Sequence, residues 1–208
     1  MLSQSHWSEE QYLRDEFASE APGLVYSSPA ALIRRLADVL VISDTHFFHH
    51  NIIEYQSRPA NADALMIQRW NERVGRDDLL LHCGDVVHGC TIEHVAQHLP
   101  RLQGKIHLLR GNHDRVGRTK YFANRNWRLV RPFEAPYREW IVRFTHRPVP
   151  VNQLPLRVLN VHGHIHGQDE PSPFHINVSV ERLDYTPAQL GPLLDAAIER
   201  CTPLALVR

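Results

Sequence analysis

Residues 39–46 read Val-Leu-Val-Ile-Ser-Asp-Thr-His, an apolar run that ends in a carboxylate and an imidazole. The run from Val39 to Ile42 predicts a buried strand. Asp44 and His46 follow directly, at the carboxyl end of that strand. Ligand sites in α/β sheets lie where strand ends give way to loops. The stretch therefore predicts both an α/β sheet and a site at its edge.

The same arrangement, an apolar run followed by polar ligand-type residues, recurs four more times along the chain. The later runs are Leu79 to Leu81, Ile106 to Leu109, Trp140 to Phe144 and Val158 to Val161. The segments that follow them are Gly84-Asp85, Gly111-Asn112-His113-Asp114, Thr145-His146 and Gly163-His164-Ile165-His166. We expect these five strand ends to converge on one metal site.

The residue types in these segments restrict the metal. They combine carboxylate, amide and imidazole donors and contain no thiolate. Calcium prefers oxygen ligands only, and structural zinc favours cysteine, so the mixture suits Mn, Fe, Zn, Ni or Co in a reactive centre. One ion needs only three or four such groups, whereas two ions with a bridging carboxylate need about seven or eight. The sequence therefore predicts two divalent transition-metal ions.

In order and context, these motifs resemble the signature of the calcineurin-like metallophosphoesterases from about Val39 to Val180. Residues 43–53, with Arg58-Pro59 further on, are similar to a branch of small bacterial and phage members. The resemblance implies an α/β layered fold, with two packed mixed β-sheets flanked by helices and a metal site at the strand ends. It also implies hydrolysis of a phosphate ester by in-line attack of a hydroxide that bridges two ions, with Mn favoured.

The resemblance also implies a ligand set, in which Asp85 bridges the two ions. The first ion would be held by Asp44, His46, Asp85 and His166. The second would be held by Asp85, Asn112, His146 and His164.

The resemblance places His113 as the catalytic residue that protonates the leaving oxygen or stabilises the transition state. Either Asp114 or His88 would orient its ring, and the sequence leaves that choice open. The Gly-Asp motif continues into Val86-Val87-His88-Gly89 and lacks the Asp-Arg-Gly of the protein-phosphatase branch. Dephosphorylation of phosphoproteins is therefore disfavoured.

Substrate-binding residues are predicted next to the metal ligands. Asn112 would contact substrate as well as metal, and His49 and Asn51 would line the substrate mouth. Residues 47–51 also have an alternative interpretation, in which Phe47 and Phe48 form a packed pair and Asn51 caps a helix that starts there.

The composition predicts an ordinary globular protein, and the resemblance implies that it acts on a phosphate ester, either a small molecule or a nucleotide. The chain has 208 residues, 43% hydrophobic and 22% charged, and its formal net charge is +0. Zero net charge disfavours nucleic acid as a partner, so a nuclease is the less favoured function. A nuclease and a non-catalytic binding scaffold are kept as alternatives. Three cysteines without C-x-x-C spacing and an acidic N-terminus predict a cytoplasmic protein without a membrane anchor. The oligomeric state is left open.

The sequence predicts two parts, an N-terminal helical extension over 1–38 that packs on the core and a single metallophosphoesterase domain over 39–208. Further helices are expected at Ser8–Ser19, Pro29–Leu36, Ala62–Val74, Ile92–Leu99 and Pro187–Glu199. A further strand is expected near Ile176, and an edge strand at Leu204–Val207.

Overall fold

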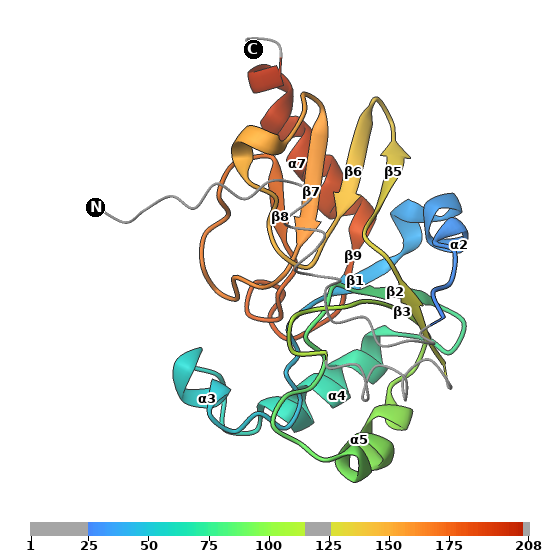
Figure 1. The fold of residues 1–208 in the computed structure, drawn as a ribbon, viewed down its shortest axis with the longest axis vertical. Coiled ribbons are helices and arrows are strands. Elements are labelled where there is room, and N and C mark those ends of the chain that lie inside the picture. Colours follow the sequence, from blue (N-terminus) through green and yellow to red (C-terminus); the bar gives the residue numbers. More distant parts are fainter. Residues whose placement is uncertain (1–24, 115–125, 206–208) are drawn as a thin grey trace.

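The fold was analysed in a computed structural model that describes residues 25–114 and 126–205. It contains two β-sheets, which lie one above the other in Figure 1. The predicted helix at Ser8–Ser19 lies outside the described residues. Within the described ranges, no helix combines the length and apolar character needed to cross a membrane.

The first sheet has the strand order β4-β3-β2-β1-β9. Four of its strands run parallel to one another: β1 (Leu40–Ile42), β2 (Leu79–His82), β3 (Lys105–Leu109) and β4 (Trp127–Val130). The fifth strand, β9 (Ala188–Gln189), pairs antiparallel with β1. Successive side chains of a strand point to opposite faces. Val41 and Leu81 accordingly join one buried cluster, while Leu40, Ile42 and Leu80 join another. Burial on both faces explains the uninterrupted apolar runs in the sequence.

Short helices cover the outer face of the first sheet. α4 (Ala62–Arg73) contributes the buried Met66 and Trp70, and Val95 comes from α5 (Ile92–His98). Figure 1 places both helices beneath this sheet and shows α3 (Ile52–Tyr55) projecting beside them. Two 3-10 turns, η2 (Leu99–Arg101) and η3 (Val151–Gln153), complete the connections.

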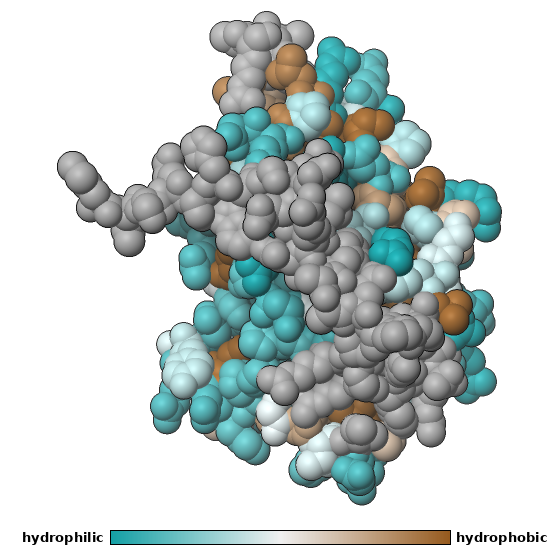
Figure 2. Space-filling model, viewed as in Figure 1, coloured by the Kyte–Doolittle hydropathy of each residue, from teal (hydrophilic) through white to brown (hydrophobic). Residues whose placement is uncertain are grey.

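The second sheet has the order β5-β6-β7-β8. Its strands are β5 (Phe133–Tyr137), β6 (Trp140–Phe144), β7 (Val158–His162) and β8 (His175–Asn177); β5 and β6 are antiparallel and the other pairs are parallel. Val142 and Leu159 join the same core cluster as Val41 and Leu81 of the first sheet. One apolar core thus connects the two sheets, as the sequence predicts. Figure 2 shows a visible described surface that is largely hydrophilic, with hydrophobic atoms in small separate groups.

The C-terminal helix α7 spans Leu190–Ala205 and packs on the core through Leu190, Leu194, Ala197 and Cys201. The edge strand expected at Leu204–Val207 is wrong at its first two residues, because Leu204 and Ala205 belong to α7. The other two residues of that expected strand lie outside the described residues. Apolar residues at the end of an amphipathic helix resemble a short strand in sequence, which explains the error. Residues 188–189, expected at the start of this helix, instead form β9.

The remaining differences from the predicted elements are small. The helix expected at Pro29–Leu36 is divided into α2 (Ala30–Arg34) and the 3-10 turn η1 (Leu36–Asp38). Leu32 and Leu36 from these elements are buried in the core cluster that joins the sheets. Strands β4 and β5 were not predicted.

Candidate metal centre

Asp44 lies just past the end of β1 and is fully buried. Its Oδ2 atom accepts hydrogen bonds from the backbone N–H of His164 at 2.8 Å and the hydroxyl of Ser179 at 2.9 Å. Its Oδ1 atom is buried and has no hydrogen-bond partner among the described residues. A buried polar atom without a partner is costly. A cation beside Oδ1 would satisfy it.

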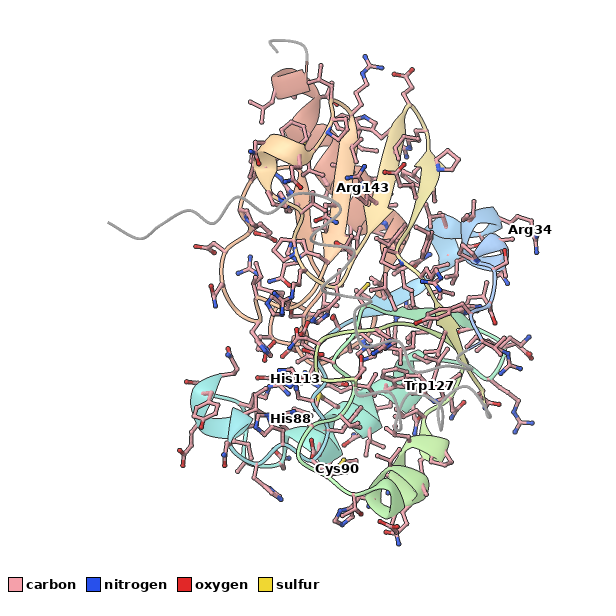
Figure 3. All side chains as sticks on the ribbon, viewed as in Figure 1. Arg34, His88, Cys90, His113, Trp127 and Arg143 are labelled. Carbon is pink, nitrogen blue, oxygen red and sulfur yellow. The ribbon has the colours of Figure 1, made fainter. Side chains whose placement is uncertain are left out.

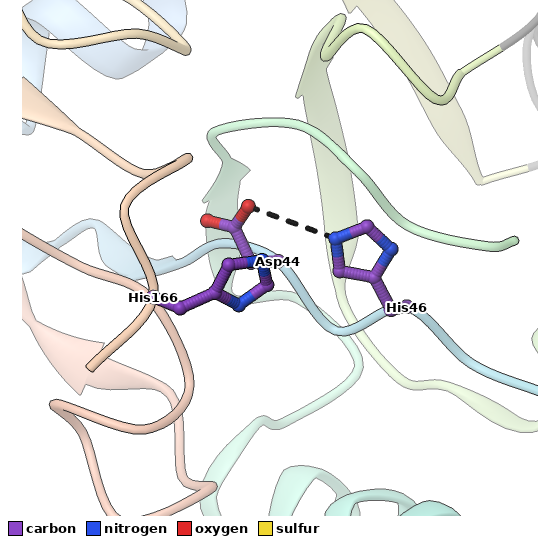
Figure 4. A group of neighbouring side chains, drawn as sticks. All are labelled: Asp44, His46 and His166. Carbon is purple, nitrogen blue, oxygen red and sulfur yellow. Dashed lines mark ion pairs between the residues drawn. The ribbon is translucent and has the colours of Figure 1, made fainter. Parts of the chain in front are cut away.

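Asp44, His46 and His166 form the first of two groups that could hold a metal ion, with their ligand atoms within 4.8 Å of one another. Figure 4 shows these three side chains close together, and its dashed line joins His46 Nε2 to Asp44 Oδ1, which lie 3.9 Å apart. The rings of His46 and His166 are stacked with their centroids 5.2 Å apart. Both ring nitrogens of His46 are buried without hydrogen-bond partners among the described residues.

Burial keeps His46 neutral, because loss of solvent lowers its pKa to about 2. Neutral imidazole is the form that binds metal. One unpartnered nitrogen of His46 and the unpartnered oxygen of Asp44 form part of a donor set that fits a divalent ion.

Asp85, His146 and His164 form the second group. His146 Nδ1 lies 2.8 Å from the carbonyl oxygen of Cys83, so it carries the proton and donates there. His146 Nε2 therefore presents a lone pair, which lies 3.3 Å from Asp85 Oδ2 and 3.0 Å from Asn112 Oδ1. Three acceptor atoms at these distances repel one another unless a cation lies between them.

Asp85 belongs to the second group and also faces the first. Its Oδ1 atom accepts the backbone N–H of His113 at 2.8 Å. Its Oδ2 atom lies 3.5 Å from His46 Nε2 in the first group and 3.3 Å from His146 Nε2 in the second. Burial alone would raise the pKa of Asp85, whereas positive charge at the position of the neighbouring imidazoles, on a protonated ring or on a bound cation, holds that pKa well below its usual value. One ionised oxygen thus faces both groups.

The backbone at these positions is unusual. Five of the seven predicted ligands have φ between 45° and 70°, in the left-handed region: Asp44, His46, Asp85, His164 and His166. This conformation costs about 1–3 kcal/mol for a residue with a side chain and is concentrated at functional sites. Backbone hydrogen bonds between loops maintain it, such as those from the N–H groups of Asp44 and His46 to the carbonyl oxygens of Gly84 and Asp85, at 2.9 and 3.0 Å.

The predicted catalytic residue His113 is half-buried beside the two groups, with its ring centroid 5.2 Å from that of His46. His88 packs edge-on against His113, with centroids 4.4 Å apart, and also against His49, at 4.3 Å. Figure 3 shows His88 and His113 close together. His88 is thus in ring contact with His113, and the choice between His88 and Asp114 as the residue that orients His113 stays a prediction.

Asp114 connects the loops that carry Asp85 and His113. Its carboxylate accepts three backbone hydrogen bonds, from Asp85 at 2.8 Å, Val86 at 2.9 Å and Gly111 at 2.8 Å. Burial, with the nearby charge of Asp85, raises the pKa of Asp114 to about 6. These bonds tie the Gly-Asp segment to the Gly-Asn-His-Asp segment, so Asp114 positions Asp85.

The predicted substrate-binding residues differ in their surroundings. Asn112 is exposed, and its side-chain oxygen contacts His146. His49 joins the cluster of rings beside the metal groups. Asn51 is exposed where α3 begins, and its side chain makes no capping hydrogen bond. The structure therefore brings His49 and Asn112 to the centre and leaves Asn51 on the surface.

Sequence reasoning missed three residues that surround the first group. Ser179 donates to Asp44, Glu181 lies 3.1 Å from His166 Nδ1, and Arg58 is buried against Glu181. In the sequence, only the resemblance to small family members marks Arg58. Ser179 and Glu181 follow a predicted strand but carry no motif that would mark them.

Comparisons with known proteins agree with this geometry. A sequence model described as calcineurin-like phosphoesterase matches residues 37–190. An uncharacterized protein of Methanocaldococcus jannaschii is 32% identical over 164 residues, which cover 73% of this chain and 86% of that protein.

A solved structure has a similar fold. A protein of unknown function from Aquifex aeolicus superposes with a TM-score of 0.57 at 24% identity, covering 72% of this chain and 93% of that one. A structure of an archaeal phosphodiesterase superposes with a TM-score of 0.38 at 17% identity, over 68% of this chain and 81% of that one.

The fold and the two ligand groups define a metal-binding α/β protein with a site at the junction of its sheets. The chain belongs to the calcineurin-like phosphoesterase family, and is therefore a hydrolase of phosphate esters.

Proposed function

We propose that this protein hydrolyses a phosphate ester with two divalent ions held by the seven predicted ligands. The observation that carries the proposal is the position of Asp85 Oδ2, which faces a nitrogen of each group. When bound, such a pair of ions neutralises phosphoryl oxygens and lowers the pKa of a water that can attack phosphorus in line. The two groups and their unpartnered buried atoms support this assignment.

The protein's own residues fix the positions of these donors. Asp44 and Asp85 each use one oxygen for hydrogen bonds from the chain and present the other to the centre. His146 is held in the tautomer that presents Nε2, because Nδ1 donates to a backbone carbonyl. The donors are thus oriented by the fold itself, which reduces the reorganisation needed on binding.

His113 is proposed to donate a proton to the leaving oxygen. Its backbone N–H is fixed by Asp85, and its ring packs against His88, which would keep it aimed at the ester. His49, whose ring packs against that of His88, would contact the substrate along with Asn112. The role of Asn51 at the mouth stays a prediction.

Mn is the ion we favour, with Fe, Zn, Ni or Co as alternatives, because the donors mix oxygen and imidazole nitrogen. The substrate is proposed to be a small molecule or nucleotide, since a formal net charge of +0 offers no general attraction to nucleic acid. The cytoplasmic location stays a prediction; the three cysteines are all buried.

The test is an activity screen of metal-stripped protein before and after addition of Mn. The substrates are a nitrophenyl monoester, a nitrophenyl diester, nucleotides and oligonucleotides. We expect no turnover without metal and recovery with Mn on at least one ester. Turnover that survives thorough chelation would contradict the proposal. Hydrolysis confined to oligonucleotides, with binding that weakens steeply as salt rises, would favour the nuclease alternative.

A further inference from the structure

Arg58 and Glu181 form a buried ion pair beside the first ligand group, although 123 positions separate them in the chain. The Arg58 Nε and Nη2 atoms donate to Glu181 Oε1 at 2.9 and 2.6 Å. The Arg58 side chain is 1% exposed and that of Glu181 is 8% exposed. A buried ion pair is retained where its geometry is good and further hydrogen bonds satisfy its atoms. Arg58 and Glu181 Oε1 make such bonds to the metal centre, while Glu181 Oε2 is buried without a hydrogen-bond partner among the described residues.

Glu181 acts on His166. Its Oε1 atom lies 3.1 Å from His166 Nδ1, which places the proton of the neutral ring on Nδ1 and leaves Nε2 as the lone pair. A carboxylate that accepts the second N–H of a metal-ligating histidine fixes the ring and raises its basicity. His166 would therefore present Nε2 to the position shared with Asp44 and His46.

Arg58 acts on the segment that follows β1. Its Nη2 atom donates to the carbonyl oxygen of Asp44 and its Nη1 atom to that of Thr45, both at 2.7 Å. These bonds hold the backbone where Asp44 and His46 adopt positive φ. The planar guanidinium can reach the carboxylate and both carbonyl oxygens together, which a lysine ammonium could not do in the same geometry.

The second ligand group is supported differently. His146 Nδ1 donates to the neutral backbone carbonyl of Cys83, and Asn112 is exposed. We propose that Arg58 and Glu181 are a positioning pair for the first metal position alone, where they set the affinity for one of the two ions. This inference rests on the two-ion centre of the proposed function.

The test measures Mn binding to metal-stripped protein by calorimetry, with no turnover involved. In the Glu181→Gln variant, the side chain keeps its shape but loses the charge that pairs with Arg58 and His166. We expect one Mn site to weaken about 10–100-fold while the other is unchanged. Arg58→Lys should weaken the same site. The matched control is Glu134→Gln, which removes an exposed pair with Arg143 at the rim of the second sheet.

The outcomes separate the two claims. Wild-type protein that binds fewer than two Mn ions would contradict the proposed function itself. Two wild-type sites that both keep their affinity in Glu181→Gln, or that both weaken equally, would overturn the positioning pair while leaving the function intact.

A second measurement needs no variant and applies if Glu181→Gln does not melt cooperatively. Long-range proton–nitrogen NMR of metal-free wild-type protein at alkaline pH reports the tautomer of each histidine. We expect the proton of His166 on Nδ1. A proton on Nε2 would overturn the inference, because the ring would then present no lone pair to the metal position.

Discussion

At the scale of single residues, each carboxylate of the centre uses its two oxygens for different purposes. Asp44 Oδ2 and Asp85 Oδ1 accept hydrogen bonds from the chain, while Asp44 Oδ1 and Asp85 Oδ2 face the imidazoles. The fold therefore fixes the direction of the free oxygens. In each of these two buried carboxylates, one oxygen thus holds the side chain in place and the other is left to bind an ion.

Asp85 is expected to affect both ions, because the same oxygen faces both groups. Asp85→Ala should remove both ions, whereas His46→Ala should leave one ion bound per chain. Elemental analysis after removal of free metal measures the ratio of metal to protein. Asp77→Asn, at an exposed ion pair with Lys105, is the control. Two ions retained by Asp85→Ala would show that Asp85 is not the bridge.

Asp114 is expected to act on stability first. An amide at this position has one acceptor oxygen in place of two, so Asp114→Asn cannot accept the three backbone bonds in the same way. Hydrogen bonds to a charged acceptor contribute about 1.5–3 kcal/mol each. We expect a loss of about 2–4 kcal/mol in the free energy of unfolding of the metal-free protein, measured by urea denaturation. Unchanged stability with a loss of turnover would instead assign Asp114 a catalytic role.

His113 is expected to matter according to the leaving group. A nitrophenolate leaves readily without a proton, whereas a sugar or alkyl alkoxide does not. Because general acid catalysis contributes about 10²–10⁴-fold, His113→Ala should lose about that factor on a nucleoside or alkyl ester and much less on a nitrophenyl ester. The comparison of kcat/KM on the two esters, with metal content unchanged, decides it. Equal losses would mean that His113 stabilises charge on the phosphoryl group.

At the scale of elements, the site depends on loops that approach one another closely at the strand ends. Gly84 has φ of +104°, and a Cβ there would lie 2.5 Å from His146 Nδ1 and 2.6 Å from the backbone nitrogen of Gly111. Only glycine allows this approach. The strands themselves were readable from their apolar runs, but such contacts between loops were not.

Gly84→Ala is therefore expected to displace His146 as well as destabilise the chain. Gly89 is the matched control, because its φ is +68° and a Cβ there meets no atom within 4 Å. Gly89→Ala should cost only the backbone strain, about 1–3 kcal/mol. Gly84→Ala should lower the melting temperature further and reduce metal content, as measured by thermal denaturation and elemental analysis. Equal effects of the two substitutions would mean that the loop contact is unimportant.

At the scale of the whole molecule, the sequence predicted the two-sheet α/β fold and the residues that the structure brings together in the two ligand groups. The fold prediction succeeded because buried parallel strands give continuous apolar runs. The residues of the two groups could be named because they follow strand ends directly, and their binding of metal stays a prediction. The pair Arg58 and Glu181 could not be predicted in the same way, since it forms only when two distant segments meet. Strand β5 was missed because its alternating burial gives a weaker apolar signal, and Leu204 was misread because a helix end can look like a strand.

The central claim is that two ions share Asp85, and anomalous diffraction from crystals grown with Mn tests it most directly. We predict two peaks per chain, ~3.5–4 Å apart as in other two-metal hydrolases, one beside Asp44, His46 and His166 and the other beside His146 and His164. Asp85 should lie between them and contact both. A single peak, or two peaks of which only one contacts Asp85, would contradict this account.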